Sequence, residues 1–196
     1  MLYKTHINNV ANKLRKSYYL ISNLIHRVSL DTVILAYQAY VNSHLMYGII
    51  FWGTSTHVKD LFIIQKKIIR LIAGVNSRQS CRPLFKKFNV LTVYSIFIVN
   101  CILFFKQNMQ YFSKRNNPYN VRVNGRIAQK NSSLTVLNNN TYNNITKICN
   151  KLPPNFLETD IKDIKRKLKK IFINEVLYSV EEYFNINFNV YCDIMS

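Results

Sequence analysis

Acidic residues are scarce in the front three quarters of this 196-residue chain. Residues 1–151 contain 21 Lys or Arg but only two acids, Asp31 and Asp60. Residues 152–196 carry six basic and seven acidic residues, so the formal charge of +18 belongs to the front. Such a charge favours a polyanionic partner, with nucleic acid first and an anionic membrane surface second. An AT-rich coding sequence is a simpler source of part of this basicity.

Glycines and paired cysteines are also few. Four glycines leave no Gly-rich phosphate loop, and four cysteines without a Cys-x-x-Cys pair exclude a zinc knuckle or a compact disulfide scaffold. We therefore expect free, mostly structural thiols. Because residues 1–10 contain no apolar run, we also expect an intracellular, reducing compartment, either cytoplasm or nucleus.

One uncharged segment, residues 88–105, can be read as a membrane span. Its 18 residues reach the lower limit for crossing a bilayer. Asn89, Thr92, Ser95 and Asn100 interrupt the run, which favours a buried core helix. A small basic membrane protein with a span at 88–105 stays open as an alternative.

Apolar residues recur at steps of three and four in most of the front region, which predicts an all-α fold. Helices are expected over 4–25, from Ser29 to about 48 or 51, from Thr56 to 73, from Ser80 to 88, and over 93–112 after Thr92. Together they predict a helical bundle spanning 1–112. The helix after Ser29 is apolar almost all round, so we expect it to be the central one.

Periodicity is lost after residue 112. Residues 113–142 predict an irregular, Asn-rich polar linker. A smaller C-terminal helical module follows over 143–184, with a helix from about Asp160 to Phe184, and residues 185–196 form an unpatterned tail.

The helix that ends at Gly74 carries the candidate binding face. Lys59, Lys66 and Arg70 fall within about 40° of one another, opposite its apolar side, and Lys67 lies nearby. No Glu lies four residues from them, so internal pairing does not explain the stripe, although a solvated face does. The candidate nucleic-acid-binding residues are Lys59, Lys66, Lys67, Arg70, Arg78, Arg82, Lys86 and Lys87. Such contacts hold phosphates without selecting a sequence.

Three segments in order resemble one known family. They are 43–53 (SHLMYGIIFWG), 61–70 (LFIIQKKIIR) and 80–85 (SCRPLF), with weaker likeness at 117–122, 150–153 and 178–183. They resemble the region downstream of the polymerase palm in non-LTR, LINE-type retrotransposon reverse transcriptases, particularly jockey-like elements. The resemblance implies a thumb, a helical bundle that holds the primer and template duplex. It also implies that Lys66, Lys67, Arg70 and Arg82 match basic family positions.

Catalytic chemistry is not expected from this chain alone. The family's Tyr-x-Asp-Asp signature, which holds two metal ions for RNA-directed DNA polymerisation, does not occur in the sequence. Asp31 and Asp60 are isolated at expected helix starts, and the histidines lack metal-ligand spacing. We therefore expect no catalytic residue, metal or cofactor, and a non-catalytic polymerase fragment that binds RNA, DNA or an RNA–DNA duplex. The alternatives are the membrane protein and a module that docks on a missing palm domain.

Overall fold

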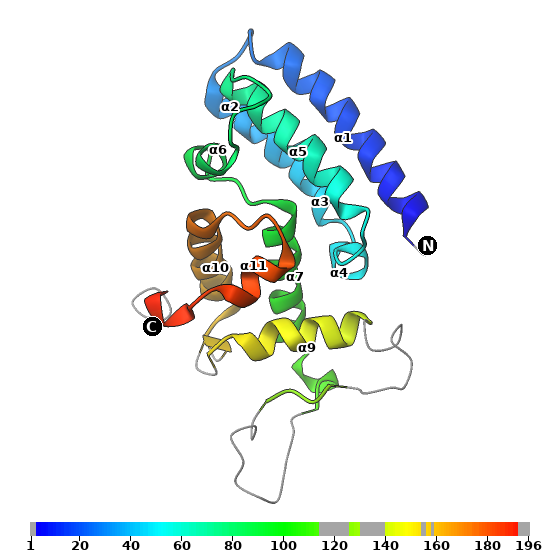
Figure 1. The fold of residues 1–196 in the computed structure, drawn as a ribbon, viewed down its shortest axis with the longest axis vertical. Coiled ribbons are helices and arrows are strands. Elements are labelled where there is room, and N and C mark those ends of the chain that lie inside the picture. Colours follow the sequence, from blue (N-terminus) through cyan, green and yellow to red (C-terminus); the bar gives the residue numbers. More distant parts are fainter. Residues whose placement is uncertain (1–2, 114–125, 130–139, 154–155, 158, 192–196) are drawn as a thin grey trace, which may run out of the picture. The chain divides into compact units, whose positions relative to one another are not determined.

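The computed structural model describes residues 3–113, 126–129, 140–153, 156–157 and 159–191 (Figure 1). Within these ranges the fold is all-α, as predicted, and no residue belongs to an extended strand. The family-like stretch at 117–122 and most of the Asn-rich segment lie outside the described residues.

The chain divides into two compact units. Unit 1 comprises Met1–Phe97 and Phe172–Val180, and unit 2 comprises Ile98–Ile171 and Glu181–Ser196. The helices that lie wholly in unit 1 are α1 (Lys4–Leu24), α2 (Leu30–Ala36), the π-helical η1 (Tyr37–Asn42), α3 (Ser43–Met46), α4 (Ile49–Trp52), α5 (Val58–Ala73) and α6 (Arg82–Lys87). The others are α7 (Val93–Gln107), η2 (Met109–Tyr111), α9 (Thr141–Lys151), α10 (Ile161–Glu175), α11 (Val180–Asn185) and η4 (Phe188–Tyr191).

The first helix agrees with its prediction. The expected stripe is buried at Ile7, Val10, Leu14 and Ile21, and the helix packs on α5. Apolar spacing alone therefore placed this helix, because it has a single buried face.

The second helix was expected at the centre, and this prediction is wrong. It continues from α2 through η1 into α3 but buries only one row, Val33, Tyr37, Val41 and Leu45, at intervals of four residues. A π-helical turn holds more residues than an α-helical turn, which keeps such a row on one side. Leu35, at 68% exposure, and other apolar side chains of this helix face solvent instead.

Helix ends show which caps were predictable. Ser29 caps α2 by accepting from the Thr32 N–H, and Gly74 closes α5 with φ of 64°. Thr56 and Ser80 were expected as caps, but the N-cap residues are His57 and Cys81. The turn before α5 is held by Ser55, one residue before the expected cap Thr56. The Ser55 hydroxyl accepts from the His57 N–H.

The uncharged run 88–105 is not one helix. The Thr92 hydroxyl accepts from the Ser95 N–H at 3.2 Å, and α7 begins only at Val93 and has 15 residues. Among the residues that the structure describes, no helix combines the length and apolar character needed to cross a bilayer.

The prediction of a single C-terminal helix over 160–184 is wrong, because the structure has two helices, α10 and α11, with a break between them. Val176 adopts φ of 44° in the break. Its carbonyl accepts from Arg82, and the carbonyl of Leu177 accepts from Thr92 at 2.7 Å. Hydrogen bonds from distant residues of unit 1 therefore satisfy the groups that an unbroken helix would have paired internally.

Candidate nucleic-acid interface

Helix α5 presents four of the eight predicted residues on a narrow strip. Its core face is wider than the periodicity indicates, because Phe62, Gln65 and Ile69 are buried beside the expected leucine and isoleucines. Lys59 and Lys67 are exposed, whereas Lys66 and Arg70 are half-buried. The wide core face confines the four cations to the remaining side of the helix.

Gln65 fixes the rotation of α5. Its side-chain amide donates to the Tyr37 hydroxyl and to the Leu91 carbonyl, each at 2.9 Å. Its oxygen accepts from the Val93 N–H at 2.9 Å. Rotating α5 would break these three hydrogen bonds of the buried Gln65 side chain, so the cationic strip is held toward solvent.

The loop and helix after α5 carry the other four predicted residues. Arg78, Arg82, Lys86 and Lys87 are all exposed in unit 1. The Arg70 side chain donates to the carbonyl of Gln79 at 2.9 Å and ties this loop to α5. α5 and α6 are in contact, so the eight cations belong to one part of unit 1. We call them the α5–α6 surface.

Two cations of this surface pack against an aromatic ring that sequence reasoning missed. The Arg82 guanidinium lies 4.3 Å from the centre of the Tyr178 ring, and the Lys66 ammonium lies 5.5 Å from it. Arg82 also donates to the carbonyl of Val176 at 3.1 Å. Such cation–π contacts orient the charges. Arg82 and Lys66 therefore help to hold residues 172–180 in unit 1.

Two cations of this surface, Lys66 and Arg70, lie near the buried thiol of Cys81. Burial raises the pKa of Cys81, and the charges of Arg70 and Lys66 lower it by a smaller amount. Burial likewise raises the pKa of Tyr178, with a further rise from Cys81, against the charges of Arg82 and Arg70. Both groups are neutral at pH 7, so the positive charge of this cluster is not cancelled.

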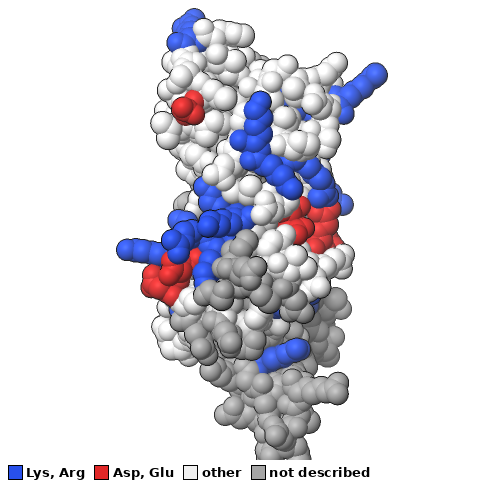
Figure 2. All heavy atoms as spheres, turned by 90° about the vertical axis from the view of Figure 1, so that its left-hand side faces the viewer, with Lys and Arg blue, Asp and Glu red and all other residues white. Residues whose placement is uncertain are grey.

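Five cations of the surface project into solvent, namely Lys59, Lys67, Arg78, Lys86 and Lys87. None of them forms an ion pair with a residue that the structure describes. Unit 1 as a whole has 13 Lys or Arg against three acids, Asp31, Asp60 and Glu175. Figure 2 looks onto the side that carries α6 and shows Lys and Arg exposed there.

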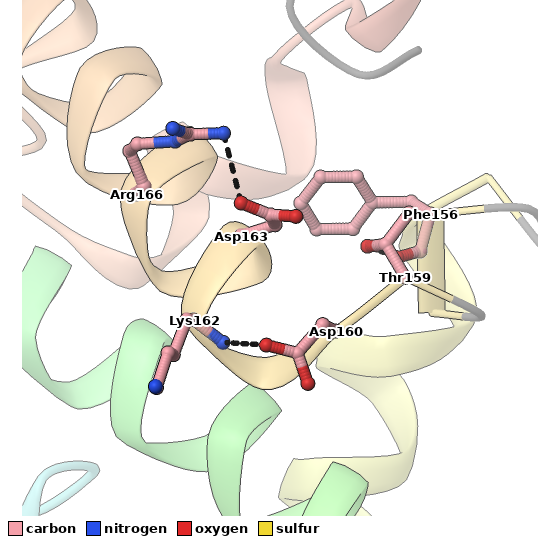
Figure 3. Close-up of polar contacts among 6 residues, drawn as sticks. All are labelled: Phe156, Thr159, Asp160, Lys162, Asp163 and Arg166. Atoms are coloured by element: carbon pink, nitrogen blue, oxygen red, sulfur yellow. Dashed lines mark hydrogen bonds and ion pairs between the residues drawn. The ribbon is translucent and has the colours of Figure 1, made fainter.

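Helix α10 has a basic face of a different kind. Lys162, Lys165, Lys169 and Lys170 are exposed, as the sequence pattern indicates. Asp163 pairs with Arg166 at 2.8 Å, and Asp160 accepts from the Lys162 N–H at 3.2 Å (Figure 3). Acids within and before this helix therefore offset part of its charge.

The remaining candidates are structural. Trp52, considered for base stacking, is 2% exposed and donates to the Tyr47 carbonyl at 3.0 Å. Cys81, Cys101 and Cys149 are free, buried thiols as predicted, whereas Cys192 lies outside the described residues. Within the described ranges, no three His, Cys, Asp or Glu side chains are grouped so as to hold a metal ion.

Compared with protein-family models, curated proteins and solved structures, the chain matches none of them.

Proposed function

We propose that this chain is the thumb and downstream region of a non-LTR retrotransposon reverse transcriptase and that it holds nucleic acid by its phosphates without catalysing a reaction. The observation that supports binding is the set of five solvent-facing cations on the α5–α6 surface, with no acid paired to them in the described part of the chain. Fixed cations without internal partners attract a polyanion most strongly. The family resemblance of residues 43–53 and 61–70 supports the thumb assignment.

The salt dependence of binding tests the phosphate contacts. The full chain is titrated with an RNA–DNA duplex at several salt concentrations. If about five cations engage phosphates, log affinity falls against log salt with a slope of roughly −4 to −5. Absence of binding at low salt, or a slope near zero, contradicts the proposal.

The genomic sequence immediately upstream tests the family assignment separately. An open frame that encodes a Tyr-x-Asp-Asp palm supports a polymerase origin. An upstream frame that encodes an unrelated domain contradicts it.

A second candidate function is docking on a partner domain such as the palm. Apolar side chains along the second helix and α4 face solvent, namely Leu35 at 68%, Tyr40 at 50% and Phe51 at 52% exposure. Exposed apolar side chains on neighbouring helices favour an interface. If docking is the function, a palm domain supplied in trans lowers the self-association of the chain, and Leu35→Ser removes that effect.

A further inference from the structure

A groove in unit 1 lies between α1 and α3, separate from the eight cations of the α5–α6 surface. His6, Asn9, Lys13 and Lys16 contribute from α1 at steps of three and four residues, so they share one face of the helix. Ser43, His44 and Tyr47 line the opposite side. The groove has a volume of about 540 Å³, within the range of roughly 300–1,000 Å³ that is usual for small-molecule sites.

The charge of the groove is positive. Lys13 and Lys16 are exposed, and no acid is among the described residues that line it. Burial and then the charge of Lys13 lower the pKa of His44, so His44 is neutral at pH 7. The two lysines therefore supply the charge, and an anionic group fits beside them.

The α1 wall of the groove also carries hydrogen-bonding side chains. Asn9 and Asn12 line the groove and are exposed. Their amide groups donate and accept hydrogen bonds, so they suit the polar edge of a ligand. Nε2 of His6 has no hydrogen-bond partner among the described residues, but this atom is buried and takes no part in this wall.

The rim of the groove carries an exposed aromatic ring. Tyr47 is 74% exposed, and its ring centre lies 6.1 Å from that of His6. An exposed Tyr beside cations and hydrogen-bonding groups suits a planar base, because every base has a face that stacks.

We propose that this groove binds one unpaired nucleotide. Its phosphate lies at Lys13 and Lys16, its base stacks on Tyr47, and a polar group of the nucleotide bonds to the side-chain amide of Asn9 or Asn12. Inorganic phosphate would use the lysines and would leave the Tyr47 ring without a partner. The proposal adds a single-strand site to the phosphate contacts of the α5–α6 surface, and either can fail without the other.

Trp52 offers a local signal for binding. It is the only tryptophan of the chain, its ring lies 6.0 Å from that of His6, and its N–H donates to the Tyr47 carbonyl. We would titrate the full chain with adenosine monophosphate, inorganic phosphate and a short single-stranded oligonucleotide while recording tryptophan fluorescence. We expect the nucleotide and the oligonucleotide to change the emission, and phosphate to bind at least about 10-fold more weakly. Equal binding of phosphate and nucleotide overturns the role of the base.

Two variants test the contacts. Lys13→Glu with Lys16→Glu, and Tyr47→Ala alone, should each raise the Kd for the nucleotide about 10-fold or more. Lys4→Glu with Arg27→Glu is the matched charge control, because these residues are exposed in unit 1 and do not line the groove. Tyr19→Ala is the matched aromatic control, since Tyr19 on α1 is 71% exposed and also lies outside the groove.

The outcomes separate this site from the α5–α6 surface. If the groove variants and their controls lose nucleotide affinity equally, the positive charge of the chain attracts the nucleotide without a specific site. That result overturns the groove as a binding site. A single-stranded oligonucleotide that changes the emission while the mononucleotide does not also overturns the one-nucleotide site. Unchanged nucleotide binding when lysines of the α5–α6 surface are reversed, together with weakened duplex binding, supports two separate sites.

Discussion

Helices α5 and α10 are both basic, but they differ in how their basic residues are paired with acids. On α5, Asp60 in the first turn lies near His57, and the lysines beyond it have no acid paired to them in the described part of the chain. On α10, Asp163 pairs with Arg166 and Asp160 caps the helix start. Paired, exposed charges stabilise a helix by a small amount and attract a polyanion less. The two surfaces therefore differ in their acids, because Arg166 of α10 is paired with Asp163 whereas none of the five solvent-facing cations of the α5–α6 surface is paired with an acid among the described residues.

Reversal of charge on the two surfaces gives the largest expected contrast. Lys59, Lys67, Lys86 and Lys87 changed to Glu should raise the Kd for an RNA–DNA duplex on the order of 100-fold at low salt. These four lysines are exposed, so their replacement does not disturb the packing of Lys66 and Arg82 on Tyr178. Binding is measured by fluorescence anisotropy.

The matched control reverses the same number of lysines on α10, namely Lys162, Lys165, Lys169 and Lys170. It changes the net charge of the chain equally, and we expect a rise in Kd of only a few-fold. Equal losses in the two variants would mean that net charge, and not the α5–α6 surface, determines binding.

Buried polar groups extend the contrast between α5 and the helices of unit 2. Gln65 makes three hydrogen bonds, whereas the buried hydroxyl of Thr146 on α9 has no partner among the described residues. Gln65→Leu should lower the free energy of unfolding by about 2–4 kcal/mol, because it leaves the Val93 N–H and the Leu91 carbonyl unpaired. Thr146→Val should leave it unchanged or raise it by about 1 kcal/mol at most.

Chemical denaturation of both variants measures these free energies. Duplex binding of the folded Gln65→Leu protein is measured alongside, because α5 loses the bonds that fix its rotation. A Gln65→Leu protein as stable as the parent chain would show that these hydrogen bonds do not hold α5.

Local patterns predicted the helices and cations but not their long-range partners. The stripe of α1 and the basic strip of α5 follow from residues close in sequence, so periodicity was sufficient. The break at Val176 contains no Gly or Pro from which it could be predicted. The Arg82 side chain that donates to the Val176 carbonyl is 94 residues away in the sequence. The packing of Lys66 and Arg82 on Tyr178 was missed for the same reason. The exposure of Leu35 was missed because the apolar content of a helix does not show which of its faces pack against another helix.

The smallest effect is expected from Asp163→Asn. Asp163 and Arg166 have side chains that are 47% and 67% exposed, so their ion pair contributes about 0.2–1 kcal/mol at low salt and less at high salt. Thermal unfolding at two salt concentrations measures this loss. Without its acid partner, Arg166 makes α10 more similar to α5, and duplex affinity should rise by less than about 3-fold. A larger rise would show that Asp163 suppresses binding by α10. The difference in binding between the two helices would then come mainly from the charge of this one residue.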